Sequence, residues 1–163
     1  MHWASWVSTL ATCTGSAGMP DGNTRPQGTI IAFDFGFRRI GVAVGQTITG
    51  SANALTVVPV SNQPDWQIIA GIINEWKPAA VVVGLPLAED GGETDMSKGA
   101  RRFGRQLEGR FGVSVDYQDE RLTSFGAEQR FVDARAQGGM RRKDAAMKDA
   151  IAAQIILENW LQT

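Results

Sequence analysis

Three carboxylates stand in sequence settings that favour chemistry over a solvent-exposed role. Asp34 interrupts the apolar run IIAFDFG, where a carboxylate is costly to bury unless a partner such as a divalent cation compensates its charge. Glu120 lies in YQDERLTS just after an expected strand, at the edge where open α/β sheets place their sites. Asp149 shares a helical face with Ala153 and Ile156, so we expect it to point toward the sheet.

Together, these carboxylates would form an oxygen-rich site for divalent cations if they converge at one sheet edge. Two cations about 4 Å apart can activate a water molecule and stabilise the leaving oxygen of a phosphodiester. This chemistry needs neither histidine nor cysteine, and the chain has one of each, His2 and Cys13. Histidine-based triads, zinc sites of histidine and cysteine, and an internal disulfide are therefore excluded. The favoured ions are Mg²⁺ and Mn²⁺.

Each carboxylate also has a purely structural interpretation, which the sequence leaves open. Asp34 could lie at a strand end and cap the turn through Gly36. Glu120 could form a surface ion pair or favour the start of a helix through its charge. Asp149 could cap a helix that begins at Ala150 instead of facing the sheet.

Basic residues lie beside these carboxylates in the sequence and predict a path for a nucleic acid. The candidates are Arg38, Arg39, Arg121, Arg141, Arg142 and Lys143. Arginine pairs well with phosphate, and such contacts supply salt-dependent affinity without sequence choice. The net charge of the chain is only −1, but residues 100–163 hold 11 basic and 9 acidic side chains, which is compatible with a polyanionic partner. The arginines within 101–110 fit a solvated helix face equally well.

The pattern of apolar residues predicts the elements that position these side chains. Strands are expected over residues 29–35, 40–45, 54–60, 79–84 and 113–118, and helices over residues 65–76, 97–110, 123–137 and 144–161. Their order predicts an α/β fold, a mixed five-stranded sheet with helices on both faces. Residues 1–27 are interpreted as a flexible N-terminal extension of a domain over 28–163. No apolar run approaches the roughly 20 residues of a membrane span.

Four motifs occur in order and resemble one family. They are GTIIAFDFGFRRIGVAVGQTITGSA, VVVGLPLAEDGGET, FGVSVDYQDERLTS and DAIAAQIILENWL, and they extend from about Gly28 to the C-terminus. They resemble the YqgF/RuvX family, the Holliday-junction-resolvase-like branch of the RNase H-like superfamily. The resemblance implies an RNase H-like fold and a metal-dependent endonuclease in the maturation of the 5′ end of pre-16S rRNA in the bacterial cytoplasm. It also places the family's acidic residues at Asp34, Glu120 and Asp149.

The sequence departs from the pattern of this family around the expected site. Phe37 stands where family members often have a small hydroxyl residue after the first DFG. In much of the wider superfamily the second acid follows the fourth strand, so Glu89 or Asp90 is a fallback metal ligand. Asp144 is a second candidate beside Asp149 in the segment before the last helix.

Other functions stay open beside a nuclease for precursor rRNA. A resolvase of four-way DNA junctions would need a dimer with two sites, and a non-catalytic RNA-binding factor of ribosome assembly would keep the fold without using the carboxylates. DFGFRRIGVAVG also resembles the phosphate-binding hairpin of actin-like ATPases, but those proteins need two such domains and 163 residues are too few. The expected partners are structured precursor RNA or branched DNA, with no membrane, and the expected assembly is a monomer or a weak homodimer.

Overall fold

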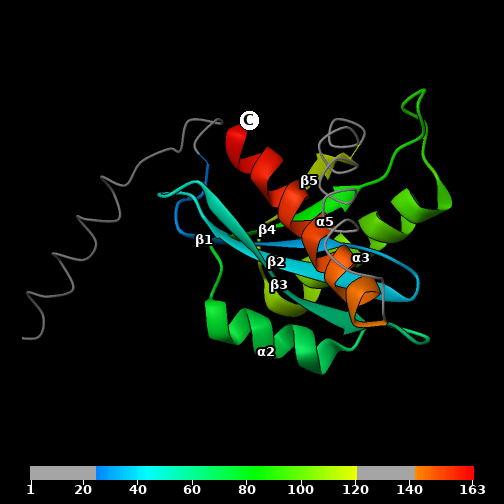
Figure 1. The fold of residues 1–163 in the computed structure, drawn as a ribbon, viewed down its shortest axis with the longest axis horizontal. Helices are drawn as coiled ribbons and strands as arrows, with labels where there is room; N and C mark the ends of the chain where they lie inside the picture. Colours follow the sequence, from blue (N-terminus) through cyan, green and yellow to red (C-terminus); the bar gives the residue numbers. More distant parts are fainter. Residues whose placement is uncertain (1–24, 121–141) are drawn as a thin grey trace, which may run out of the picture.

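The fold is built on one sheet, seen in a computed structural model whose described residues are 25–120 and 142–163 (Figure 1). Its five strands are β1 (Thr29–Asp34), β2 (Arg39–Gln46), β3 (Ser51–Pro59), β4 (Ala80–Leu85) and β5 (Val115–Asp119). They lie side by side in the order β3-β2-β1-β4-β5. The central strands β1 and β4 are near-continuous apolar runs because they are buried on both faces.

The sheet is mixed, as the connections between its strands predict. β1 pairs with β2 and β2 with β3 in antiparallel fashion, because short turns join them. β4 runs parallel to β1 and β5 parallel to β4, because helical connections precede them. The carboxyl ends of β1, β4 and β5 consequently meet at one edge of the sheet. This order and these directions are the RNase H-like arrangement that the resemblance implies.

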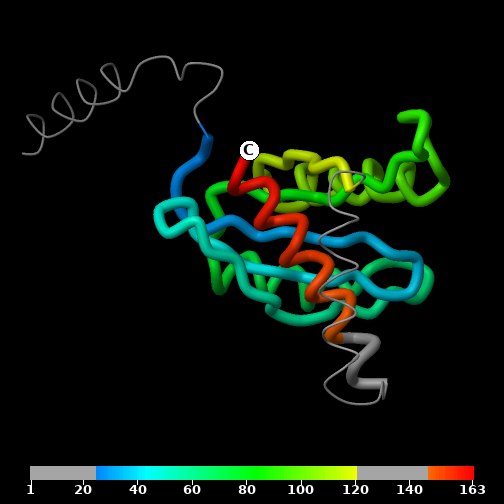
Figure 2. Tube along the Cα trace, turned by 45° about the horizontal axis from the view of Figure 1, so that its top comes forward, coloured from blue at the N-terminus to red at the C-terminus, as the bar shows by residue number. Residues whose placement is uncertain are grey.

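Helices cover both faces of the sheet, which confirms the predicted layers (Figures 1 and 2). α2 (Trp66–Trp76) and α3 (Asp95–Phe111) pack on one face, and α5 (Arg142–Gln162) crosses the other. Successive strand residues point to opposite faces. In β1, Ile31 and Phe33 therefore join the core under α2 and α3, whereas Ile30 and Ala32 join the core under α5.

The helix starts are fixed by side-chain caps. Asp65 caps α2, and its carboxylate accepts a hydrogen bond from the backbone N–H of Ile68 at 3.3 Å. Thr94 caps α3 in a reciprocal box with Ser97, in which each side chain accepts from the backbone N–H of the other residue. This box starts α3 at Asp95, slightly before the predicted start at residue 97.

The starts of β3 and α5 also differ from the prediction. The third strand begins at Ser51 rather than at residue 54, because Gly50, with a positive φ of 65°, closes the preceding turn tightly. The last helix already includes Arg142, ahead of the predicted start at residue 144. Asp149 therefore lies inside this helix, and the alternative in which it caps a helix beginning at Ala150 is wrong.

Some predictions fall on residues outside the described ranges. These are the helix over 123–137, residues 1–24 of the expected extension, and the side chains of Arg121, Arg141, Arg142, Lys143 and Asp144. Arg25, near the end of that extension, lies against the C-terminal helix, with its guanidinium 5.2 Å from the ring centre of Trp160 and donating to the carbonyl of Leu161 at 3.1 Å. In the described part of the chain, no helix is long and apolar enough to cross a membrane.

Candidate active site

Asp34 is the last residue of β1 and is partly buried. It lies on the α5 side of the sheet, because it continues the alternation that places Ile30 and Ala32 in the core under α5. β1 is a central strand, so its carboxyl end lies beside the ends of β2 and β4. A carboxylate at this position can meet side chains from the neighbouring strands and from α5.

Asp34 and Glu120 are in direct contact, with a hydrogen bond between their side chains. Glu120 directly follows β5, which β4 separates from β1. The contact can span β4 because Gly84 has no side chain. A Cβ at residue 84 would overlap the Glu120 carboxylate and would lie 2.5 Å from Cδ1 of Ile156. The glycine thus leaves the space in which the two carboxyl groups meet.

Burial raises the pKa of both carboxyl groups in this pair. For Asp34 the loss of water contact is the largest cause, followed by the charge of Glu120, the hydrogen bond with it and the charge of Asp149. These effects hold the pKa of Asp34 well above its ordinary value. The pKa of Glu120 is raised by burial, lowered in part by the hydrogen bond from Asp34, and raised by the charge of Asp119. Both carboxyl groups therefore hold a proton to higher pH than they would in water.

Asp149 approaches this pair from α5 and is held by an arginine. The Nε of Arg39 lies 2.8 Å from Oδ2 of Asp149, and the two side chains are 47% and 28% exposed. Arg39 is the first residue of β2, just past the turn that follows Asp34. The ion pair orients the Asp149 carboxylate and offsets part of the negative charge gathered at the end of β1.

The backbone of α5 comes very close to β2 at Gly41. A Cβ at residue 41 would overlap the carbonyl oxygen of Asp149 and would lie 3.0 Å from the backbone nitrogen of Ala150. Gly41 is the cross-strand partner of Asp34, so this approach sets Asp149 over the end of β1. Sequence reasoning missed both Gly41 and Gly84. The available signal was a glycine inside a buried apolar strand, which marks the close approach of another group.

The all-oxygen donor set of this cluster suits a hard divalent cation. Among the described residues, no three His, Cys, Asp or Glu side chains lie close enough to hold one ion between them. The structure brings Asp34 and Glu120 into contact and Asp149 into electrostatic range of Asp34, without a closed triad. The pair fits a cation nevertheless, because two partly buried carboxyl groups meet in the space that Gly84 leaves open, where a cation would offset their combined negative charge.

The fallback acids Glu89 and Asp90 lie in the loop after β4, and both are exposed. Asp90 accepts a hydrogen bond from the backbone N–H of Gly92 at 2.8 Å, which shapes the loop itself. Neither acid is among the groups that shift the pKa of Asp34 or Glu120.

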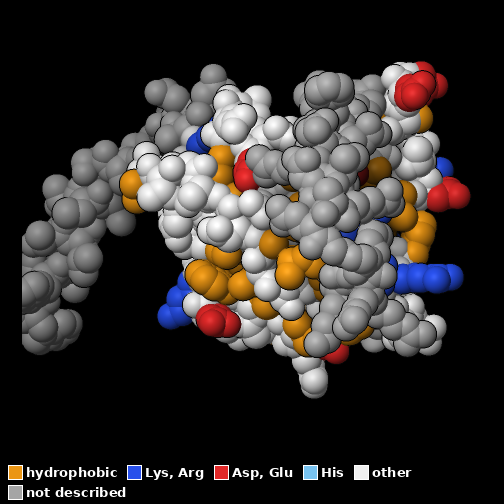
Figure 3. Space-filling model, viewed as in Figure 1, with side chains coloured by type: hydrophobic (Ala, Val, Ile, Leu, Met, Phe, Trp, Pro, Cys, Tyr) orange, Lys and Arg blue, Asp and Glu red, His pale blue; other side chains and the backbone are white. Residues whose placement is uncertain are grey.

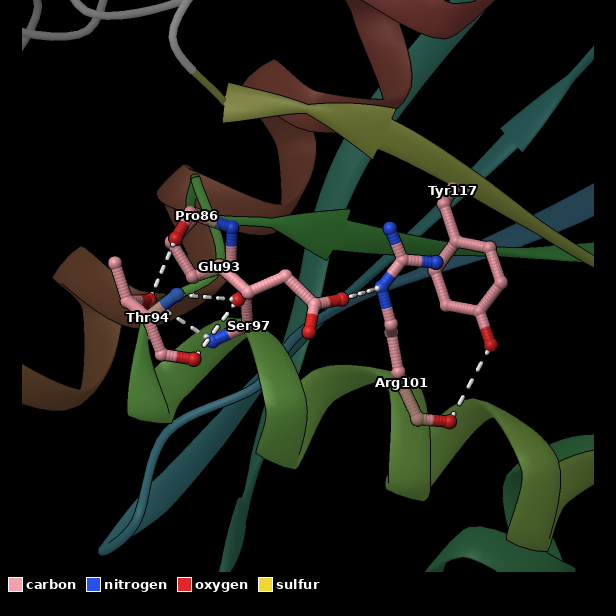
Figure 4. Close-up of polar contacts among 6 residues, drawn as sticks. All are labelled: Pro86, Glu93, Thr94, Ser97, Arg101 and Tyr117. Carbon is pink, nitrogen blue, oxygen red and sulfur yellow. Dashed lines mark hydrogen bonds and ion pairs between the residues drawn. The ribbon is translucent and has the colours of Figure 1, made fainter. Parts of the chain in front are cut away.

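The end of this loop is anchored to α3 and β5 (Figure 4). The Thr94 hydroxyl donates a hydrogen bond to the carbonyl of Pro86 at 2.9 Å, which ties together the two ends of the loop. Glu93 forms an ion pair with Arg101 at 2.8 Å, and the Arg101 guanidinium lies 5.6 Å from the ring centre of Tyr117. These contacts fix the loop beside the carboxyl end of β4, where the acid pair lies.

Only part of the predicted nucleic-acid path can be placed. Arg38 is exposed in the turn between β1 and β2, whereas Arg39 is engaged with Asp149. The remaining candidates have side chains outside the described part: Arg121, Arg141, Arg142 and Lys143. On the face that α5 crosses, described Lys and Arg side chains are visible at the lower left and at the right edge (Figure 3).

Comparison with known proteins places this arrangement in a family. A family model for RuvX, described as Holliday junction resolvase, matches residues 28–163. The chain belongs to the RuvX family. Relatives from Yersinia pestis (strain Pestoides F) and Yersinia pseudotuberculosis serotype O:1b (strain IP 31758) are each 50% identical over 133 residues, which is 81% of this chain and 93% of the relative. Both relatives have the name "Putative pre-16S rRNA nuclease".

Solved structures show more distant likenesses to this RuvX family chain. RuvC of T. thermophilus, in complex with a Holliday junction substrate, aligns with a TM-score of 0.44 and 17% identity over 79% of this chain and 91% of that chain. Pelota of Archaeoglobus fulgidus aligns with a TM-score of 0.41 and 10% identity over 96% of this chain and 39% of that chain. Family membership rests on the sequence match, which confirms the resemblance carried by the four motifs.

Proposed function

We propose that this RuvX family chain is a metal-dependent endonuclease that hydrolyses phosphodiester bonds in the maturation of the 5′ end of pre-16S rRNA. The observation that carries the proposal is the hydrogen-bonded pair of Asp34 and Glu120 beside Asp149. Burying two carboxyl groups together costs free energy, and a cation that binds there offsets this cost. The names of the half-identical relatives support precursor rRNA as the substrate.

In this proposal, Asp34, Glu120 and Asp149 hold Mg²⁺ or Mn²⁺. When bound, such cations activate the attacking water and stabilise the charge of the leaving oxygen. The contribution of the chain itself begins with a proton. Because the pKa values of Asp34 and Glu120 are raised, either group must release any proton that it holds before both can serve as anionic ligands.

The surrounding residues position these carboxylates and bind the substrate. Gly84 leaves room for the Glu120 carboxylate, and Gly41 lets α5 bring Asp149 close. Arg39 restrains Asp149 through its ion pair, so we assign it to positioning a carboxylate rather than to binding a phosphate. Arg38 lies exposed in the turn that follows β1, where it can contact a phosphate of the substrate. Further phosphate contacts are assigned to Arg121, Arg141, Arg142 and Lys143.

Cleavage of a four-way DNA junction is the second candidate function. It is favoured by the description of the matching family model, Holliday junction resolvase. Resolution of a junction needs two sites that act on two strands, and therefore a homodimer. Cleavage of structured precursor RNA needs only one site, which a monomer or a weak homodimer in the cytoplasm supplies.

A cleavage assay with the purified full-length chain separates these candidates. A precursor 16S rRNA fragment and a four-way DNA junction are incubated side by side with Mg²⁺, Mn²⁺ or EDTA. Cation-dependent cleavage of the RNA alone supports the proposal, and cleavage of the junction alone supports the second candidate. Cleavage in EDTA would contradict the metal site. Binding of the RNA without cleavage of either substrate would indicate a non-catalytic assembly factor.

A further inference from the structure

A small pocket lies near the carboxyl end of β1, on the face of the sheet opposite α5. Its volume is about 230 Å³. One wall is aromatic and comes from Phe35, Phe37 and Phe103. The remaining lining residues, most of them polar, come from the segment between β3 and α2 and from α3. The acid pair lies on the other face of the sheet, so the pocket is a separate feature of the same edge.

The aromatic wall is a chain of packed rings that ends at the surface. Trp66 stacks on Phe103 with ring centres 5.7 Å apart, and Phe35 follows at 5.5 Å from Phe103. Phe37 completes the series with its ring centre 5.9 Å from Phe35 and is 55% exposed. The packed inner rings hold the outer ones in place. An exposed phenyl ring on a rigid support of this kind is a preformed stacking surface.

The polar side of the pocket offers donors and acceptors and one positive charge. Asn62, Gln63 and Gln106 line it with amide groups, which can both donate and accept hydrogen bonds. In the described part of the chain, Arg102 is the only charged side chain on its walls. The lining therefore matches a ligand that is planar, polar at its edge and attached to negative charge.

The pocket wall and the acid pair are neighbours in the sequence, although they face opposite sides of the sheet. Phe35, in its wall, directly follows Asp34, and consecutive Cα atoms are about 3.8 Å apart. The turn between them and β2 exposes Arg38. A single strand that contacts both the acid pair and the pocket crosses this turn, because the two lie on opposite faces of the sheet.

We propose that this pocket binds one unpaired nucleobase of the substrate, stacked on Phe37, with the strand's phosphate on Arg102. The inference rests on the proposed function for its substrate. A cavity of about 230 Å³ is smaller than the roughly 300–1,000 Å³ of sites for drug-sized ligands, which suits a single ring system. Aromatic stacking accepts any base, while the amides contact its edge. The pocket thus favours an unpaired position near the scissile bond.

The first test measures binding without cleavage, in EDTA. Single-stranded RNA and DNA oligonucleotides of the same sequence, labelled with a fluorophore, are titrated with the full-length wild type and with Phe37→Ala. We expect Phe37→Ala to weaken binding about tenfold, because base–aromatic stacking is lost. The control is Ile48→Ala, an 83% exposed apolar residue in the turn at the other end of β2, which should bind like the wild type. Equal affinity of Phe37→Ala and wild type would overturn the inference.

The second test locates the base by removing it from the ligand. In a series of oligonucleotides, each with one abasic position, one position should cost the wild type about tenfold in affinity. The same position should cost Phe37→Ala nothing further, because the stacking partner is already missing. Equal losses in both proteins would overturn the inference. Abasic losses in the RNA series alone would support it and identify RNA as the ligand.

A matched pair of arginines in α3 tests the phosphate contact. The slope of the logarithm of the binding constant against the logarithm of the salt concentration should fall by about one in Arg102→Ala. Arg105 is exposed on the same helix but lies outside the pocket, so Arg105→Ala should keep the slope of the wild type. Equal slopes would contradict the role of Arg102. These binding measurements need no catalysis. If the pocket variants bind like the wild type while the wild type cleaves RNA, the pocket inference is wrong and the proposed function is unaffected. If the binding tests support the pocket but the wild type cleaves no substrate, only the proposed nuclease function is contradicted.

Discussion

The carboxyl groups of Asp34 and Glu120 are hydrogen-bonded to each other across the end of β4. Two carboxylates that share a partly dry site repel each other when both are ionised, and water no longer screens them. Burial is the largest cause of the raised pKa of each group, and the charge of Glu120 raises the pKa of Asp34 further. The cation-free protein relieves the repulsion by keeping a proton, and a bound cation relieves it by adding positive charge.

The stability of the cation-free protein is expected to fall as the pH rises. The pKa values of Asp34 and Glu120 are raised in the folded state, so this state binds more protons than the unfolded chain. The contribution of these two groups to folding stability is fully present below their pKa values in the unfolded chain, about 4. It is lost as the pH rises through their pKa values in the folded state. Urea unfolding in EDTA should show Asp34→Asn gaining stability over the wild type as the pH rises above about 4. A pH-independent difference would contradict the raised pKa.

Substitution of Gly84 by alanine should separate the acid pair. The added methyl group overlaps the Glu120 carboxylate, so Glu120 must move away from Asp34. A displacement of about 1 Å can cost about 100-fold in rate, and we expect at least this loss in single-turnover cleavage. Overpacking should also cost about 1–3 kcal/mol of stability.

Gly71→Ala is the matched control for this substitution. Gly71 is exposed in α2, and a Cβ there meets nothing within 4 Å. Alanine at this position should stabilise the helix by about 0.5–1 kcal/mol and leave cleavage unchanged. Wild-type cleavage by Gly84→Ala would show that the contact between Asp34 and Glu120 is not needed.

Removal of Arg39 should impair cleavage more than it impairs folding. The ion pair with Asp149 is about half exposed, so Arg39→Ala should change the free energy of unfolding by less than about 1 kcal/mol. The Asp149 carboxylate loses its restraint, so kcat should fall and more Mn²⁺ should be needed for half-maximal rate. The kcat of Arg39→Lys should lie between those of the wild type and Arg39→Ala, because lysine keeps the charge without the planar geometry of arginine.

Arg38→Ala provides the comparison for Arg39. Arg38 is the preceding residue, lies exposed in the turn, and is assigned to a substrate phosphate. Its removal should raise KM and leave kcat and the Mn²⁺ dependence near those of the wild type. The same kinetic pattern for both variants would contradict a positioning role for Arg39.

The strands and the acidic residues could be predicted because each leaves a local signal in the sequence. Apolar runs mark β1 and β4, and a carboxylate inside such a run marks Asp34. The contact between Asp34 and Glu120 follows from parallel strands that end at one sheet edge. The nuclease function was inferred from the family resemblance, and the roles of the individual site residues stay predictions.

Other parts of the site depend on distances that no local pattern records. Arg39 adjoins the Asp34 turn in the sequence, yet it pairs with Asp149, because α5 crosses over β2 at Gly41. The space at Gly84 likewise exists only once Glu120 has folded over β4. The capping box of α3 has Ser97 where the usual motif has Glu or Gln, so its sequence signature was hidden.

The central claim is that Asp34 and Glu120 hold the catalytic cation. Its most direct test is a titration of Mn²⁺ into the full-length chain, measured by isothermal titration calorimetry. Wild type and Asp90→Asn, a change in the exposed loop after β4, should bind Mn²⁺ with the same affinity and release protons on binding. Asp34→Asn and Glu120→Gln should each bind at least about tenfold more weakly and lose cleavage in parallel. If Asp34→Asn binds Mn²⁺ as tightly as the wild type and still cleaves, the acid pair is not the catalytic cation site.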